Sequence, residues 1–181
     1  MATYRRVLVL GGARSGKSRH ALALAEASGR ERVFVATAEP HDEEMRTRIA
    51  QHRAEREGAW RTREAPLDLA AVIDGEAALG RVVLVDCLTL WLTNVLLAER
   101  DVGAASAALA KAVAGARGPL ILVSNEVGHG IVPATPLGRA FRDAQGRLNQ
   151  EMAASCDAVV FVAAGCASLL KPAPALSLAL A

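Results

Sequence analysis

Residues 11–18 read Gly-Gly-Ala-Arg-Ser-Gly-Lys-Ser, which matches the pattern G-x-x-x-x-G-K-[ST]. Glycines in this pattern let the backbone turn so that several N–H groups point at one anion, and the lysine adds a positive charge for the β- and γ-phosphates of a nucleotide. The closing serine supplies a hydroxyl to Mg²⁺. The sequence therefore predicts a phosphate-binding loop made of Gly11, Gly12, Ala13, Arg14, Ser15, Gly16, Lys17 and Ser18.

Lysine is rare in this sequence, which strengthens the interpretation of the loop. Of the 21 basic residues, only Lys17, Lys111 and Lys171 are lysines. One of these three occupies the position where a compact ammonium group is needed. The opposing interpretation is a structural strand-turn-helix in which the glycines occur by accident.

A second candidate group is the carboxylate of Asp86, which ends the apolar run 82–85. In proteins with such a phosphate loop, an acid at the end of a strand holds Mg²⁺ or its water shell. Asp86 is therefore a predicted metal-linked acid, together with Ser18. The alternative is that Asp86 caps the helix that follows.

His52 has Arg53 and Arg56 beside it in a segment with helical periodicity, residues 42–57. This helix would follow the second strand and start on the phosphate side of the sheet, where an imidazole among phosphate-binding cations is a candidate reactive group. A histidine on an apolar stripe is otherwise a core or boundary residue, and that interpretation stays open.

Two further residues lie where a ligand could reach them. Thr37 comes just after an expected strand, at the end that faces the ligand crevice in open α/β sheets, although it also suits an ordinary polar turn. Glu64 could bind a ribose hydroxyl or Mg²⁺, or it could be a solvent carboxylate paired with Arg61 or Arg63.

These residues need a scaffold, and apolar runs that alternate with helical patterns supply one. Trp91, in the apolar stretch 88–97, is expected in the core, and residues 60–66 are expected to form a connector. From Gly165 onward the chain is expected to trail off without a further element. The expected strands are 5–10, 32–36, 81–86, 119–124 and 158–163, and the expected helices are 18–28, 42–57, 67–78, 104–116 and 136–157.

The composition suits a single α/β domain. The chain has 181 residues, of which 52% are hydrophobic and 3% aromatic, as expected for parallel strands that are buried on both faces. We predict a P-loop fold of the RecA or Rossmann-like type, with a mostly parallel sheet flanked by helices. The domain is placed at residues 1–171, with 172–181 as a C-terminal tail.

Charge and hydropathy argue against several other classes of protein. The net charge is +2 and both signs are interspersed, so no basic face for nucleic acid is expected. The longest apolar run, 82–97, is interrupted by Asp86 and Asn94, so no membrane span is expected, and with no signal pattern the protein is expected to be cytoplasmic. The three cysteines lack metal-ligand spacing and are expected to be small buried thiols.

Several segments, taken in order, strongly resemble the bifunctional adenosylcobinamide kinase / adenosylcobinamide-phosphate guanylyltransferase family of cobalamin biosynthesis. The resemblance covers about residues 5–171, and the blocks 45–66 and 125–133 are its most specific parts. The segments are Gly-Gly-Ala-Arg-Ser-Gly-Lys-Ser-Arg-His at 11–20, Ala-Thr-Ala at 36–38, Asp-Glu-Glu-Met-x-x-Arg-Ile-x-x-His-Arg-x-x-Arg at 42–56, Trp-Arg-Thr-x-Glu-x-Pro at 60–66, Val-Asp-Cys-Leu-Thr-x-Trp-Leu-Thr-Asn at 85–94, Ser-Asn-Glu-Val-Gly-x-Gly-Ile-Val-Pro at 124–133 and Gly-Arg-Leu-Asn-Gln at 146–150.

The resemblance implies two reactions. The first phosphorylates the aminopropanol hydroxyl of adenosylcobinamide with ATP or GTP, and the second transfers GMP from GTP to that phosphate through a phosphoramidate on a histidine, here His52. Lys17 would act in the first reaction. The family also suggests Mg²⁺, a homo-oligomer, and nucleotide contacts from the phosphate loop and from Ala36, Thr37, Ala38, Arg53, Ala54, Glu55, Arg56, Glu64 and Asp86.

Two rival functions use the same phosphate loop. A plain small-molecule kinase would use Lys17 and Asp86 and leave His52 inert. A regulatory nucleotide switch would bind a partner, although the base-reading Asn-Lys-x-Asp string of GTPases is absent from the sequence.

Overall fold

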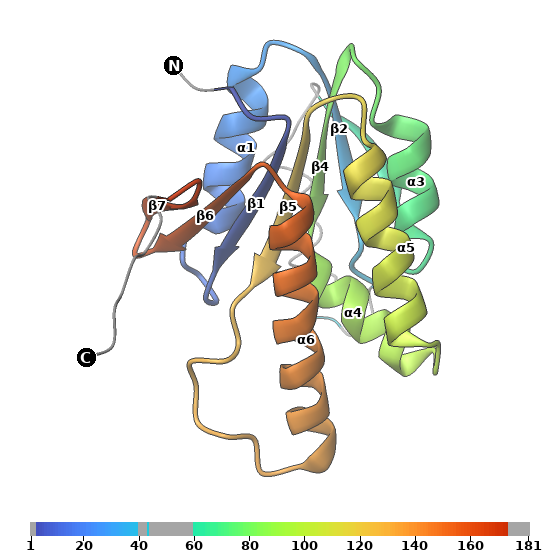
Figure 1. The fold of residues 1–181 in the computed structure, drawn as a ribbon, viewed down its shortest axis with the longest axis vertical. Helices are drawn as coiled ribbons and strands as arrows, with labels where there is room; N and C mark the ends of the chain where they lie inside the picture. Colours follow the sequence, from blue (N-terminus) through green and yellow to red (C-terminus); the bar gives the residue numbers. More distant parts are fainter. Residues whose placement is uncertain (1–2, 40–42, 44–59, 174–181) are drawn as a thin grey trace, which may run out of the picture.

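The computed structural model describes residues 3–39, 43 and 60–173. These residues form a seven-stranded sheet in the order β3-β2-β4-β5-β1-β6-β7, in which β1–β6 are parallel and β7 is antiparallel to β6 (Figure 1). The elements are β1 (Arg6–Gly11), α1 (Lys17–Ala27), β2 (Glu31–Ala36), β3 (Trp60–Glu64), α3 (Leu69–Glu76), β4 (Arg81–Asp86), α4 (Leu88–Leu97), α5 (Val102–Gly115), β5 (Leu120–Asn125), α6 (Pro136–Ser155), β6 (Ala158–Ala163) and β7 (Cys166–Lys171).

The predicted α/β class is confirmed. Each predicted strand, and each predicted helix among the described residues, agrees with the observed element to within two residues at either end. The helix predicted at 42–57 falls almost entirely outside the described residues. No helix that the structure describes is long and apolar enough to cross a membrane.

The sheet divides the core into two parts. One face packs against α3, α4, α5 and α6, and the other packs against Ala21 and Ala25 of α1 (Figure 1). Trp91 is 2% exposed, and its indole Nε1 donates a hydrogen bond to the carbonyl of Leu67 at 3.0 Å, which confirms its expected place in the core. Fully burying a side chain such as Leu92 contributes about 1.5–3 kcal/mol, so this larger face carries much of the stability.

Residues 60–64 form β3, an edge strand, and the prediction of a connector was wrong. The segment reads Trp-Arg-Thr-Arg-Glu and lacks the apolar alternation that identifies strands. It is held to the sheet by pairing with β2, and the ring of Trp60 packs edge-on against Phe34 with the centroids 6.2 Å apart. Charge rather than apolar burial stabilises the rest of this strand.

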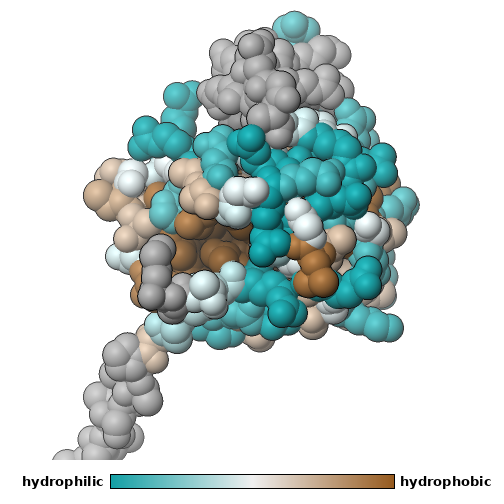
Figure 2. Space-filling model, turned by 90° about the horizontal axis from the view of Figure 1, so that it is seen from above, coloured by the Kyte–Doolittle hydropathy of each residue, from teal (hydrophilic) through white to brown (hydrophobic). Residues whose placement is uncertain are grey.

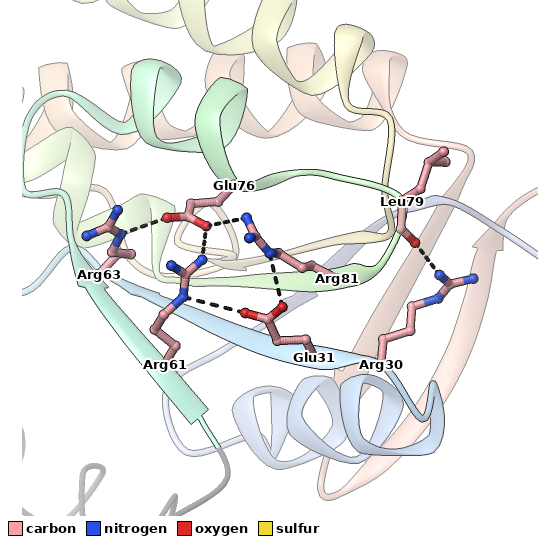
Figure 3. A network of polar contacts seen from close by, with 7 residues as sticks. All are labelled: Arg30, Glu31, Arg61, Arg63, Glu76, Leu79 and Arg81. Carbon is pink, nitrogen blue, oxygen red and sulfur yellow. Dashed lines mark hydrogen bonds and ion pairs between the residues drawn. The ribbon is translucent and has the colours of Figure 1, made fainter.

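Glu76, at the end of α3, is the centre of a network of charges that reaches three strands (Figure 3). Its side chain is 6% exposed and accepts hydrogen bonds from Arg61, from Arg63 at 2.7 Å and from Arg81 at 3.1 Å. Arg81 also contacts Glu31 on β2 at 3.2 Å. A buried carboxylate is tolerated here because several cations share it.

The network lies toward the end of the sheet where the parallel strands begin. Glu31 and Arg81 are the first residues of β2 and β4, and Arg30 directly precedes β2 and donates to the carbonyl of Leu79 (Figure 3). Figure 2 shows that this end of the molecule is mostly hydrophilic, with hydrophobic side chains reaching the surface in separate areas. The charges at this end of the sheet therefore stabilise the fold, whereas the phosphate loop lies at the opposite end of the strands.

Residues 166–171 form β7, whereas the sequence predicted that the chain would trail off after Gly165. Strands β6 and β7 are joined by the two-residue turn Ala164-Gly165, and both residues have positive φ, 52° and 78°. This is the pattern of a tight hairpin turn, and alanine at its first position hid the signal. Lys171 then fixes the strand to α6, because its Nζ donates to the carbonyls of Ala153 and Cys156 at 2.8 and 2.6 Å.

Glu76→Gln is expected to lower the free energy of unfolding at neutral pH by about 2 kcal/mol, because three arginines lose the charge they share. Burial alone raises the pKa of Glu76, but the hydrogen bond from Arg63 and the charges of Arg61, Arg63 and Arg81 outweigh burial and hold the pKa below its ordinary value of 4.5. The contribution is thus present above pH 4.5 and is lost as the pH falls through the lowered pKa. Urea unfolding at several pH values measures it.

The matched control is Asp143→Asn, which removes an exposed carboxylate that pairs with Arg142 at 3.0 Å. That change is expected to cost less than about 0.5 kcal/mol. Equal losses in the two variants, or a Glu76→Gln deficit that does not shrink in acid, would contradict the role given to the network.

Candidate active site

The phosphate loop lies between β1 and α1, as the sequence predicted. Strand β1 ends at Gly11, and α1 begins at Lys17 after Gly16, which has φ 94°. Arg14 also has a positive φ of 56°. The φ of Gly16 is one that glycine adopts without strain. Gly16 therefore allows the chain to turn sharply into α1, so that the first N–H groups of the helix face the loop.

Gly11 is needed for a different reason, which is lack of space. A Cβ atom at this position would collide with the carbonyl oxygen of Val162 on β6 and would lie 2.5 Å from Ser15 Oγ. The loop is closed further by a hydrogen bond from the N–H of Ser15 to the carbonyl of Gly12 at 3.3 Å. Gly11 and Ser15 therefore pack the loop against the sheet, while Ala13 and Arg14 at its tip are exposed.

Lys17 is 7% exposed although it is charged. Its Nζ donates a hydrogen bond to the carbonyl oxygen of Gly12 at 3.2 Å, so the ammonium group lies over the loop. A lysine in this position is oriented toward the place where the loop would hold phosphates. The role of Lys17 in phosphoryl transfer stays a prediction.

The turn of the last hairpin supports the loop from outside, and sequence reasoning missed this contact. The N–H of Gly165 donates to the carbonyl of Ser15 at 2.8 Å. A Cβ atom on Gly16 would lie 3.2 Å from the Cα of Gly165, so the two backbones approach closely. The only signal in the sequence was a glycine after an apolar strand, which predicts a turn but not its neighbour.

Asp86 lies on the same face of the sheet as the loop. Side chains alternate along a strand, and Leu84 of β4 and Val9 of β1 both pack on the α1 side. The Asp86 side chain and the Cβ position of Gly11 therefore also lie on that side. The register continues outward, since Ala36 pairs with both Asp86 and Glu64. The structure thus brings the loop, Ala36, Asp86 and Glu64 to one edge of the sheet.

The structure bears on the alternatives that the sequence left open for Asp86, Thr37 and Glu64. The N-cap residue of α4 is Cys87, which makes no side-chain capping bond, so Asp86 is not the capping residue. Thr37 is fully buried, and its hydroxyl donates to the carbonyl of Cys87 at 2.8 Å and accepts from its N–H at 2.9 Å. The Thr37 hydroxyl therefore connects the end of β2 to the start of α4. Arg61 and Arg63, the arginines considered as partners of Glu64, both contact Glu76.

The oxygen groups at this edge fit Mg²⁺. Ser18 and Asp86 offer a hydroxyl and a carboxylate, which are hard ligands of the kind this ion prefers. Among residues 3–39, 43 and 60–173, no group of three or more His, Cys, Asp or Glu side chains could hold a metal ion.

The expectation that the three cysteines are buried thiols is confirmed for two of them. Burial, together with the charge of Asp86, raises the pKa of Cys87 to about 11, and burial raises the pKa of Cys156 to about 12. Both are therefore inert thiols at neutral pH, as expected. The expectation was wrong for Cys166, which is exposed on β7.

The proposed nucleophile is not part of this description. His52 and its neighbours Arg53, Ala54, Glu55 and Arg56 lie outside the described residues, as do most of the residues in the predicted helix 42–57. Ala38 is described and follows β2 directly after Thr37. The geometry above therefore concerns the phosphate loop and the carboxylate side of the site.

Comparison with known proteins identifies the family. A family model described as cobinamide kinase / cobinamide phosphate guanyltransferase matches residues 7–170. The chain is 49% identical over 171 residues to the bifunctional adenosylcobalamin biosynthesis protein CobP of Pseudomonas aeruginosa, with 93% of this chain and 99% of that protein covered. It is 38% identical over 180 residues to the bifunctional adenosylcobalamin biosynthesis protein CobU of Escherichia coli, with 91% and 99% covered.

Among solved structures, the chain is similar to the P4 protein from bacteriophage phi6 in complex with ADP, at 16% identity and a TM-score of 0.47, covering 91% of this chain and 53% of that one. The curated relatives are matched almost from end to end, and the family model spans β1 to β7. The resemblance drawn from the sequence motifs is therefore confirmed. The chain belongs to the cobinamide kinase / cobinamide phosphate guanyltransferase family.

Proposed function

We propose that this chain phosphorylates the aminopropanol hydroxyl of adenosylcobinamide with ATP or GTP. It then transfers GMP from GTP to the new phosphate, which gives adenosylcobinamide-GDP and pyrophosphate. The observation that carries the proposal is the phosphate loop, with Lys17 folded over it and Asp86 on the same face, in a member of this family. The corrinoid substrates and the two nucleotides follow from the family and the loop.

The first reaction asks mainly for positioning and for neutralisation of charge. Loop N–H groups and the start of α1 hold the β- and γ-phosphates, and Lys17 follows the phosphoryl group as it moves to the acceptor. Ser18 would bind Mg²⁺ directly, and Asp86 would bind either the ion or a water molecule on it. The ion would neutralise charge on the phosphates. A buried lysine strengthens such interactions because little water screens it.

The second reaction needs a nucleophile that holds GMP between GTP and the corrinoid phosphate. His52 is the proposed group, because a neutral imidazole attacks phosphorus near pH 7 without a dedicated base. Arg53 and Arg56 would stabilise the charge on the α-phosphate. Ala36, Ala38, Ala54, Glu55 and Glu64 are proposed as further nucleotide contacts, carried over from the family motif. The family motif includes Thr37 as well, but its side chain is fully buried and its hydroxyl is bonded to Cys87, so we assign it a structural role.

We also propose that the protein is a homo-oligomer. Support comes from the edge strand β7, where Leu169 and Leu170 are 51% and 50% exposed, and from Ile131, which is 98% exposed. An uncovered edge strand with apolar side chains is a surface that another chain tends to cover. Sedimentation of the full chain is expected to give a mass above 18.9 kDa, and a strictly monomeric protein would contradict the proposal.

Asp86→Asn tests the metal-linked role of the carboxylate. Asparagine keeps the shape but removes a unit of charge, so both reactions are expected to slow by at least about tenfold and to recover in part at raised Mg²⁺. The measurement is the rate of each reaction across a Mg²⁺ titration. Unchanged rates and an unchanged Mg²⁺ dependence would leave Asp86 without this role.

His52→Asn tests the guanylyl step. Wild-type protein is expected to take up label from α-labelled GTP in a bond that is labile to mild acid and stable to alkali, whereas γ-label leaves with pyrophosphate. The variant is expected to lose this adduct and the transfer of GMP, yet to phosphorylate cobinamide, because Lys17, Ser18 and Asp86 are intact. Transfer that persists in the variant removes His52 from the mechanism. Wild-type kinase activity without α-label favours the plain kinase.

A further inference from the structure

Asn125 occupies the strand end that separates the phosphate loop from Asp86. It is the last residue of β5, which lies between β1 and β4, and it pairs in register with Gly11. Along β5, Ile121 and Val123 pack on the α1 side, so alternation points the Asn125 side chain to that side as well. Val123 pairs with Asp86, which places Asn125 two residues further out along the same face.

The backbone of Asn125 is fixed by side chains from two helices. Its N–H donates to Thr89 Oγ1 on α4 at 2.9 Å, and its carbonyl accepts from Asn149 Nδ2 on α6 at 3.0 Å. Asn149 is itself fixed, because its Oδ1 accepts from Ser124 Oγ at 2.7 Å and from Gln145 Nε2 at 3.0 Å. Four polar side chains, each no more than 8% exposed, thus surround one strand end.

Such an arrangement costs free energy unless the hydrogen bonds are made, and here they hold Asn125 in one place. The side-chain oxygen of Asn125 is nevertheless buried without a hydrogen-bond partner among the described residues. Ser15 Oγ in the phosphate loop is in the same condition. Gly11 links the two residues, since it pairs in register with Asn125 and a Cβ atom on it would lie 2.5 Å from Ser15 Oγ.

We propose that Asn125 is a further substrate-contacting residue of the phosphoryl-transfer step. Its amide Nδ2 donates to an oxygen of the terminal phosphate, and its Oδ1 accepts the hydrogen bond of the acceptor hydroxyl, so one carboxamide aligns the two reacting groups. The inference rests on the proposed function, and it adds a residue that orients the hydroxyl without removing its proton.

The transfer balances without a basic residue at this position. A bond forms between the hydroxyl oxygen and the γ-phosphorus, and the bond from that phosphorus to the β,γ-bridging oxygen breaks. The nucleoside diphosphate leaves with that bond's electron pair, and the hydroxyl proton passes to an oxygen of the transferred phosphoryl group. A neutral carboxamide accepts a hydrogen bond throughout but does not take up the proton near pH 7.

The test compares binding of a non-hydrolysable ATP analogue with binding of ADP by calorimetry, in wild-type protein and in Asn125→Ala. Loss of a bond to a charged oxygen is expected to raise the Kd of the triphosphate about fivefold or more while the Kd of ADP stays within about twofold. The kcat for phosphorylation of cobinamide is expected to fall about thirtyfold, and α-label uptake from GTP much less. Asn125→Asp should disfavour the triphosphate further, because it adds a negative charge.

Asn149→Ala is the matched control, since it removes the bond to the Asn125 carbonyl but keeps the Asn125 carboxamide. It is expected to lower Tm and to weaken both nucleotides alike. The inference is overturned if Asn125→Ala behaves in that way, or if it changes neither the preference for the triphosphate nor kcat. Should Asn125→Ala not fold, Asn125→Asp gives the same two readouts in a shape-conserving variant. If wild-type protein does not phosphorylate cobinamide but the loss of triphosphate preference is seen, the proposed function fails and the phosphate contact stands.

Discussion

At Gly11 the first strand, the sixth strand and the phosphate loop come so close together that no side chain fits between them. Any Cβ atom there would push β6 away or displace Ser15, and cores at native density have no slack for either movement. The orientation of Lys17 follows from the same packing, since its ammonium group reaches back to the carbonyl of Gly12. The site is therefore built from backbone contact first and from charge second.

The order of the strands determines which groups can meet at this edge. With β5 between β1 and β4, the phosphate loop and Asp86 are separated by one strand, and the end of that strand is held by Thr89 and Asn149. The two faces of the sheet carry different groups. The face toward α1 carries the groups for chemistry, while the face toward α3–α6 carries most of the apolar burial and the polar side chains that anchor Asn125.

The sequence predicted the central strands and the phosphate loop because buried parallel strands are nearly continuous apolar runs and the loop has a spacing fixed by phosphate geometry. It missed β3 because Trp-Arg-Thr-Arg-Glu is held by ion pairs with Glu76, which no local pattern reveals. It missed β7 because its turn uses alanine at a positive φ and its side chains are exposed. Contacts of the kind made by Gly165 depend on tertiary approach, so only the folded chain shows them.

The elements that support the phosphate loop lie far from it along the chain, and this has a consequence for synthesis on the ribosome. Strand β1 is made early but pairs with β5 and β6, and the N–H of Arg6 donates to Asp157, 151 residues later. Contacts of such long range form slowly, because closing the intervening chain costs entropy before any bond is gained. One edge of β1 therefore stays unpaired until β5 has been made, the other until β6 has been made, and the contact from Gly165 to Ser15 can form only after that. The loop between β1 and α1 is therefore one of the last parts of the molecule to reach its final packing.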